Sequence, residues 1–307
     1  MSTVATEQAV ASLAPPREPS LWAERAGSVR RYLRRNPALV VGLLMLLALL
    51  VFVVVGSFMV DLQRARPLSA RALQPPSAAL PFGSDKQGRD LFAVMVAGTP
   101  LTIRIGLIAG LIGTTVGATL AFIGGYYGGW IDAVIRVVVD VGLTIPVLMV
   151  LIVLAMTFRS GITVDQMALI VALLAWLFPA RTMRAQVLTV KERGYVQLAR
   201  LSGVSGPEVI VKELLPNLLP YIVASLVGSV ISAIFASIGL EILGLGSADA
   251  PTIGMTLYWV NFNAAIINGW WWWWVPPIVV IATLFIALFL ITVGLDEVAN
   301  PRLRRQV

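Results

Sequence analysis

Long apolar segments separated by short polar ones dominate the chain. An α-helix rises about 1.5 Å per residue, so roughly 20 apolar residues cross a hydrocarbon core of about 30 Å. The segments predicted to span a membrane cover approximately residues 37–60, 101–123, 133–157, 166–184, 221–245 and 274–295. The fourth has a short apolar run, so we expect its helix to continue through Arg181 and Arg184 into the cytoplasm. The pattern predicts an all-α membrane protein with six transmembrane helices, and residues 37–307 form its single membrane domain.

The polar segments between these spans predict a tail and loops. Residues 1–36 are rich in Ala, Ser, Pro and Arg without a sustained period, so we expect a basic, cytoplasmic N-terminal tail. Residues 61–100 form a polar excursion, and shorter outer loops are expected at 159–165 and 247–269. Two glycines among short acids at 83–90 predict a tight, hydrogen-bonded turn. For this turn we favour a rigid loop against the bundle over a direct substrate contact.

Two side-chain patterns within the spans predict packing. Glycines recur at three- and four-residue spacing in the second span and give a flat face for close helix packing; they are Gly106, Gly110, Gly113 and Gly117. Arg136 and Asp140 are spaced to pair on one face of the third span. Because an unpaired charge at mid-bilayer costs about 2.5–3.5 kcal/mol, we expect an internal ion pair there and favour it over a proton relay.

The composition agrees with a bilayer protein and removes several classes of enzyme. Of the 307 residues, 58% are hydrophobic and 13% are charged, whereas soluble domains carry about 25% charged residues. Cysteine and histidine are absent, which removes thiol chemistry, histidine general bases and the commonest metal ligand. The net charge of +7 arises beside apolar spans, so it indicates membrane topology rather than nucleic-acid binding.

The distribution of Lys and Arg predicts the orientation of the spans. With the N-terminus inside, fifteen of these residues fall in the inner segments and six in the outer ones. Cytoplasmic loops carry the excess of Lys and Arg in membrane proteins. We therefore expect both termini and the polar segment 193–220 to lie in the cytoplasm.

This polar segment is a charged island between apolar runs, and it predicts two short amphipathic helices. The first is expected at 195–202, followed by Gly203, where a left-handed residue often ends a helix. The second is expected to begin at a Ser-Gly-Pro-Glu capping box at 205–208. Two prolines, Pro216 and Pro220, are expected to stop it.

The same segment resembles the EAA loop of bacterial ABC-importer permeases, whose pattern is Glu-Ala-Ala, three residues, Gly, nine residues, Ile-x-Leu-Pro. The residues in register are Ala199, Gly203, Leu215 and Pro216. Gln197, Leu198 and Glu213 depart from the pattern. The wider string 184–220 and the Gly-Ser-Asp-x-x-Gly-Arg-Asp box within 81–90 resemble the C-type permease of the dipeptide/oligopeptide branch.

The resemblance implies an assembly in which the loop is a coupling helix seated in a groove of a cytoplasmic ATPase. On this chain the implied ATPase-coupling residues are Gln197, Leu198, Ala199, Arg200, Leu201, Gly203, Leu215 and Pro216. The implied partners are a second permease subunit, two ABC ATPase domains and an extracytoplasmic substrate-binding protein, in the lipid bilayer of a bacterial or archaeal cytoplasmic membrane. The chain has no Gly-rich Walker loop, so we expect no directly bound cofactor and ATP use by the partner. The resemblance also implies alternating access.

The fifth span carries small polar residues that are expected in the translocation path. They are Ser229, Ser232, Ser237 and, near the outer end, Glu241. The family usually has Glu at position 237 and Ser at position 241. A Gly-Leu-Glu motif similar to residues 239–241 occurs in a branch of the family that is associated with oligosaccharides. A short peptide and a short oligosaccharide both remain open as substrates, with the sugar slightly ahead.

Five consecutive tryptophans at 270–274 precede the sixth span. An interfacial aromatic belt and stacking on sugar rings are both open, and we favour the belt because consecutive helical residues point in different directions.

Two other classes of function are a secondary transporter or channel and an intramembrane enzyme. A secondary transporter or channel would use no ATPase and would not need the docking loop, and inverted repeats with broken helices are not evident. An intramembrane enzyme would need a convergent nucleophile, base or metal ligands, and only Asp140, Glu241 and several serines remain. The sequence therefore predicts neither a catalytic nor a metal site.

Overall fold

The computed structural model of the protein describes residues 36–158 and 161–299. Within these ranges the regular elements are helical, with one isolated β-bridge between Ser84 and Asp90. The elements are α3 (Pro37–Met59), η1 (Leu62–Ala65), α4 (Leu91–Tyr127), α5 (Gly129–Thr144), α6 (Val147–Met156), α7 (Val164–Ala175), α8 (Leu177–Lys191), α9 (Gly194–Leu201), α10 (Gly206–Val209), η2 (a π-helix, Ile210–Leu214), α11 (Leu215–Ile242), α12 (Ile253–Phe262) and α13 (Trp271–Ala299). The predicted all-α class is confirmed, whereas the predicted N-terminal tail lies outside the described residues apart from its last position.

Within the described ranges, four helical stretches are each long and apolar enough to cross a membrane. They are α3, α4, the continuous stretch Gly206–Ile242 and Trp271–Leu295 of α13. Two bent pairs, α5 with α6 and α7 with α8, qualify only if each pair counts as one span. The bends are 81° and 41°, so the third and fourth predicted spans are broken helices, and the candidate spans number four to six.

The larger break lies at Ile145 and Pro146. Ile145 has extended backbone angles, and Pro146 is the N-cap of α6. Proline disfavours the helical conformation of the residue before it and supplies no N–H to the preceding turn. The apolar run 133–157 therefore has the length of one straight span but cannot form one.

The second predicted span begins ten residues earlier than expected. The Asp90 carboxylate accepts a hydrogen bond from the backbone N–H of Phe92 at 3.0 Å and so caps the start of α4. The polar excursion consequently ends at residue 90, and Pro100 lies inside the helix.

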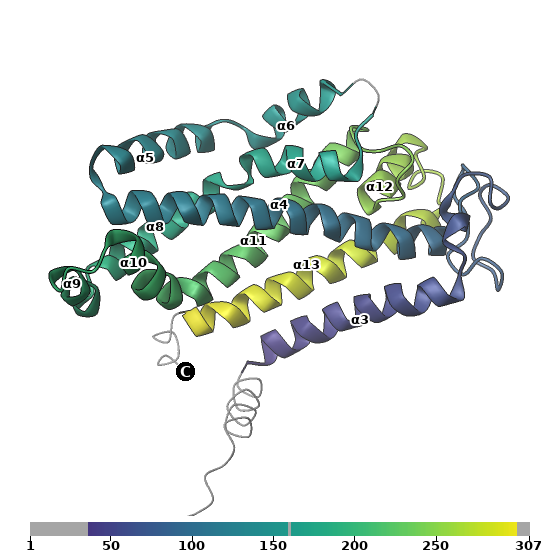
Figure 1. The fold of residues 1–307 in the computed structure, drawn as a ribbon. Coiled ribbons are helices and arrows are strands. Elements are labelled where there is room, and N and C mark those ends of the chain that lie inside the picture. The colour runs from purple at the N-terminus through teal and green to yellow at the C-terminus, as the bar shows by residue number, and fades with distance from the viewer. Residues whose placement is uncertain (1–35, 159–160, 300–307) are drawn as a thin grey trace, which may run out of the picture. The chain divides into compact units, whose positions relative to one another are not determined.

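α4 packs closely against α11 on one side and against α7 and α8 on another, as Figure 1 shows. A Cβ added at Gly106 or Gly110 would lie 2.3 Å from the Ile234 side chain or 2.7 Å from that of Val230, both on α11. Farther along, the glycine face meets the α7–α8 bend, because a Cβ at Gly113 would lie 2.7 Å from Ala175. The predicted glycine packing face is therefore confirmed.

Figure 1 places α9 and α10 at one end of the bundle, near the C-terminal end of α4, and places the 61–90 loop and α12 at the other. α12 also shows that the predicted 247–269 loop is partly helical. In the 61–90 loop, the buried Asp85 carboxylate accepts hydrogen bonds from the Arg89 side chain at 2.6 Å and the Arg89 backbone at 2.9 Å. The predicted rigid, hydrogen-bonded turn is confirmed.

The tryptophan run packs beside this turn. Trp273 is fully buried, and the indole N–H of Trp272 points to the Ser84 carbonyl at 3.4 Å. Trp270, Trp272 and Trp274 are partly buried in the same apolar cluster. Only Trp271 of the five is exposed, at 55%, so most of the run packs within the chain, and the aromatic belt stays a prediction. The tryptophans fill the space between the 61–90 loop and α12.

Candidate functional site

The predicted coupling loop folds as a short helix pair. α9 is anchored by Val196, which is fully buried in an apolar cluster with Phe122 and Tyr126 of α4. Gly203 has a φ of +78°, which confirms the predicted left-handed end, and its N–H donates to the carbonyl of Arg200 at 3.1 Å. No heavy atom lies within 4 Å of a Cβ built at Gly203, so backbone conformation rather than close packing explains the glycine.

The second helix of the pair differs from the prediction. Ser205 is the N-cap of α10, but its side chain makes no capping hydrogen bond, so the predicted capping box is wrong. Pro216 lies in the first turn of α11, directly after the π-turn η2, and Pro220 lies inside α11. Neither proline stops the helix, because the π-turn η2 at 210–214 joins α10 to α11 without an end.

α9 presents an apolar surface away from the bundle. The exposed fractions of Leu198 and Leu201 are 65% and 85%. At its edge, the Arg200 guanidinium lies 5.4 Å from the Tyr126 ring centre, and the Gln197 amide donates to Glu192 at 3.1 Å. Exposed apolar anchors with a polar rim are typical of a protein-docking surface.

The eight predicted coupling residues separate into two groups. Gln197, Leu198, Ala199, Arg200 and Leu201 share α9, and Gly203 follows it directly. Ala199 faces the bundle, since it packs on the apolar cluster around Val196. Leu215 and Pro216 begin α11 and are separated from α9 by α10 and η2.

Ion pairs join α5 to α8 between this loop and the rest of the bundle. The Arg184 guanidinium donates two hydrogen bonds to the two oxygens of Asp132, and the exposed fractions of these side chains are 22% and 16%. Asp140 lies 4.0 Å from Arg181 in a more exposed contact. The predicted Arg136–Asp140 pair is therefore wrong, because the partner of Asp140 comes from the neighbouring helix. We call the residues Asp132, Asp140, Arg181 and Arg184 the α5–α8 seam.

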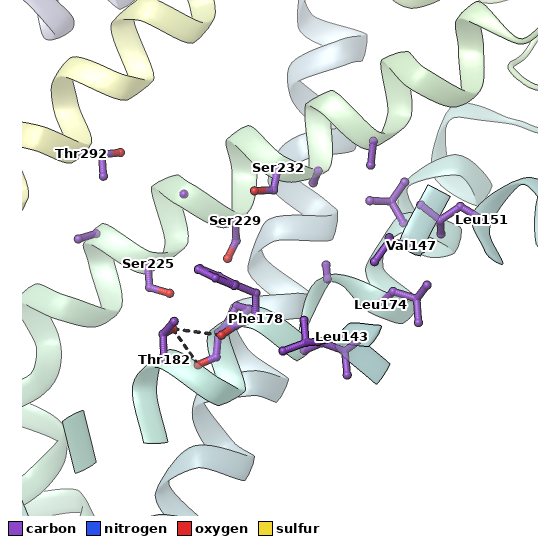
Figure 2. Close-up of a pocket in the computed structure, with 18 of the residues that line it drawn as sticks. Leu143, Val147, Leu151, Leu174, Phe178, Thr182, Ser225, Ser229, Ser232 and Thr292 are labelled. Atoms are coloured by element: carbon purple, nitrogen blue, oxygen red, sulfur yellow. Dashed lines mark hydrogen bonds between the residues drawn. The ribbon is translucent and has the colours of Figure 1, made fainter. Parts of the chain in front are cut away.

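A cavity of about 390 Å³ lies beside the seam, where α11 faces α8 and the α5–α6 break. Figure 2 shows Ser225, Ser229 and Ser232 of α11 on one side of it and Phe178 on the other. Spacings of four and three residues place these serines on one face of α11. The Thr182 hydroxyl donates to the carbonyl of Phe178 at 3.1 Å.

The described residues that line this cavity are apolar or carry hydroxyl groups, and none is charged. Phe178 is 65% exposed, so the cavity is open along one side of the chain. Such a wall can contact a solute through hydroxyl groups and aliphatic surface but cannot neutralise a charged group on it.

Two of the four residues predicted for the translocation path lie elsewhere. Ser237 is fully buried, and its hydroxyl donates to the carbonyl of Ile234 at 2.9 Å. Glu241 is 1% exposed and accepts a hydrogen bond from the Thr252 hydroxyl at 2.8 Å. A Cβ at Gly254 would lie 2.1 Å from a Glu241 oxygen, so the acid is enclosed by α12. Ser237 and Glu241 therefore do not line this cavity, and their place in the translocation path stays a prediction.

Four residues of these sites were not predicted from the sequence: Phe178 and Thr182 at the cavity, and Asp132 and Arg184 in the seam. The charge at 132 lies in a predicted turn, and the residues from 177 to 184 look like the end of an amphipathic helix. No spacing within one helix could reveal that these residues meet another helix. A proline, Pro179, was the one local signal that the helix begins anew there.

Comparison with known proteins identifies the family. The model of the binding-protein-dependent transport system inner membrane component matches residues 113–305, and that of the N-terminal transmembrane domain of oligopeptide transport permease C matches residues 24–76. With its apolar helices, this makes the chain a multi-pass membrane protein of the permease class. The chain belongs to the family of binding-protein-dependent transport system inner membrane components.

Curated relatives place it near the C-type permeases. The chain is 32% identical over 275 residues to the dipeptide transport system permease protein DppC of Bacillus subtilis, which covers 90% of this chain and 85% of the relative. It is 27% identical over 278 residues to a putative peptide transport system permease of Brucella abortus, covering 90% and 92%. With the oligopeptide transport system permease protein OppC of Mycobacterium tuberculosis, identity is 27% over 174 residues, covering 57% and 60%.

Proposed function

We propose that this chain is one of two permease subunits of an ATP-driven, binding-protein-dependent importer of short peptides. The observation that carries the proposal is the 32% identity, over 90% of the chain, with a dipeptide permease. The Brucella and Mycobacterium relatives are also named for peptides or oligopeptides. The sequence alone slightly favoured an oligosaccharide, and none of these three relatives is named for one, so the proposal now favours peptides.

In this proposal α9 docks on a cytoplasmic ATPase subunit. The exposed side chains of Leu198 and Leu201, the polar rim of Arg200 and the excess of Lys and Arg in the inner segments support it. The assembly then contains two ATPase domains, a second permease and an extracytoplasmic binding protein, with both termini of this chain in the cytoplasm. Single cysteines at the exposed positions Ser205 and Ser77 should react with impermeant reagents from opposite sides of the membrane.

The serine-lined cavity would form this subunit's wall of the translocation path. The second permease would close its open side, and alternating access would turn it from one side of the membrane to the other. Because the cavity wall carries no charged side chain among the described residues, it suits passage of varied peptides rather than tight recognition. Selection of the substrate would then fall to the binding protein.

The test is uptake by the complete complex in proteoliposomes, with a labelled dipeptide and a labelled trisaccharide compared side by side. We expect ATP-dependent uptake of the dipeptide. Ser232→Leu, at the cavity wall, should lower uptake while the ATPase subunits still co-purify, and Ser57→Leu, on the exposed face of α3, should not. Uptake of the sugar alone would refute the substrate assignment. Uptake that needs no ATP or no ATPase subunit would refute the transporter class.

A further inference from the structure

A second, larger cavity lies at the other end of the bundle, away from the serine-lined cavity. It has a volume of about 570 Å³ and lies between the C-terminal half of α3 and the loop that joins α3 to α4. Its floor includes Phe52, Gly56 and Phe92, and its opposite wall includes Ala78 and Ala79. We call it the α3 groove.

The floor of the α3 groove is formed by aromatic rings in mutual contact and by a close approach of α3 to α4. The rings of Phe52 and Phe92 meet edge to face with centres 5.8 Å apart, and both contact the Phe82 ring. A Cβ at Gly56 would lie 2.5 Å from the Val96 side chain, so α3 and α4 are in close contact below the groove. The groove stays open because the loop residues that line it between positions 78 and 81 have small side chains: Ala78, Ala79 and Pro81, all of which are exposed.

The α3 groove lies on a strongly apolar and mostly exposed helix. Only 17% of the apolar window of α3 is buried within the chain, and its mean hydropathy is 3.3. Val51, Val55 and Met59 line the groove and are 49%, 48% and 73% exposed. Met59 follows Val51 by eight positions, which corresponds to about 12 Å along the helix axis. This length approaches one leaflet of a hydrocarbon core that is about 30 Å thick.

One end of the groove is charged. The Arg64 guanidinium lies 3.4 Å from a carboxylate oxygen of Asp90, and both residues line the groove. The Asp90 side chain is fully buried, whereas the Arg64 side chain is 39% exposed. The ion pair therefore holds a partly solvated guanidinium at the mouth of an apolar channel. A guanidinium has five N–H donors in a fork that matches the geometry of a phosphate.

We propose that the α3 groove binds one phospholipid from the leaflet on the side opposite the coupling loop. An acyl chain lies along Phe52, Gly56 and Phe92, and the phosphate accepts hydrogen bonds from Arg64. An apolar channel of leaflet depth that ends in an ion pair, with the guanidinium as its solvent-accessible member, suits the acyl chain and the phosphate of a phospholipid. The described lining of this groove shares no residue with the serine-lined cavity, so the inference is independent of the transported substrate.

The first test uses the full-length chain, purified in detergent with the subunits that accompany it and then delipidated. Palmitoyl-oleoyl phosphatidylglycerol is added, and adducts are counted by native mass spectrometry. We expect one tightly held lipid in the wild type. Ala79→Leu, which fills the groove from an exposed position, should weaken binding at least tenfold. Ala72→Leu, on the same loop but outside the groove, should bind as the wild type does. Equal binding by Ala79→Leu and Ala72→Leu would refute the site.

A second test needs no substitution that could affect folding. A phosphatidylglycerol with a photoactivatable diazirine on its acyl chain should label peptides that contain residues 51–60 or 78–92 above the rest of α3. Inorganic phosphate at millimolar concentration should not compete, because it lacks the acyl chain. Competition by inorganic phosphate would reduce the site to an anion contact at Arg64. Uniform labelling along α3 would show ordinary annular lipid, and either outcome overturns the proposal.

Discussion

The α5–α8 seam offers a controlled test of how burial sets the strength of an ion pair. Two pairs join the same two helices: Asp132–Arg184 has two hydrogen bonds and side chains 16% and 22% exposed, whereas Asp140–Arg181 is a 4.0 Å contact with side chains 51% and 64% exposed. A hydrogen-bonded charge pair that is mostly shielded from water contributes about 2–3 kcal/mol, since removal of one partner leaves the other charge poorly solvated. An exposed pair contributes about 0.2–1 kcal/mol.

The measurement is a double-mutant cycle for each pair, with alanine substitutions and unfolding by a denaturing detergent. We expect a coupling free energy of about 2 kcal/mol between Asp132 and Arg184 and less than about 0.5 kcal/mol between Asp140 and Arg181. The double variant should destabilise the chain by less than the sum of the two single variants, because each single change already removes the whole pair. Equal coupling in the two cycles, or no coupling between Asp132 and Arg184, would refute the reasoning from burial and geometry.

Three further predictions rest on single contacts. Gly110→Ala should lower the free energy of unfolding by about 1–3 kcal/mol, because its Cβ would lie 2.9 Å from the Val230 backbone nitrogen. Gly228→Ala is the control and should leave the free energy of unfolding unchanged, because no heavy atom lies within 4 Å of its Cβ. Equal effects of the two variants would contradict the packing argument. Gly203→Val should weaken co-purification of the ATPase. Gly203→Asn should retain the co-purification, because asparagine tolerates the left-handed φ of +78°. Co-purification with both variants would show that the turn is not needed for docking. Glu241→Ala should destabilise the chain by about 1–3 kcal/mol, because it removes the hydrogen bond from Thr252. A transport defect with unchanged stability would instead support the predicted role of Glu241 in the translocation path.

Apolar length predicted where the chain crosses the membrane, because a helix of about 20 apolar residues is the simplest way to satisfy backbone groups in lipid. Apolar length is misleading at 133–157, because this run is long enough for one span but Pro146 divides it into α5 and α6. Hydropathy averages over a window and carries no information about backbone donors. The start of α4 was also missed, because the apolar run 91–97 that follows the Asp90 cap was assigned to the polar excursion, whereas Pro100 lies inside the helix.

Contacts between residues of different helices could not be predicted from the sequence, for a different physical reason. The spacing of Arg136 and Asp140 correctly places them on one helical face. It does not show which residues of neighbouring helices contact that face, and Arg181 of α8 lies 4.0 Å from Asp140. The tryptophan run illustrates the same limit. Its composition is typical of an interface, yet the loop 61–90 and α12 cover most of it in the folded chain.

The coupling loop and the serines of the fifth span were predicted from the sequence as separate features, and in the structure α8 relates that loop to the serine-lined cavity. Phe178 and Thr182, at its beginning, line the cavity, and two residues separate its last residue, Lys191, from α9. The Lys191 ammonium donates to the carbonyl of Gly125 at 2.9 Å, so α8 is also tied to the C-terminal end of α4. A displacement of α9 therefore meets a helix held on two sides, by α4 and by the α5–α8 seam. Under the proposed function, the strength of the Asp132–Arg184 pair sets how far that displacement is transmitted to the cavity wall rather than lost in local bending.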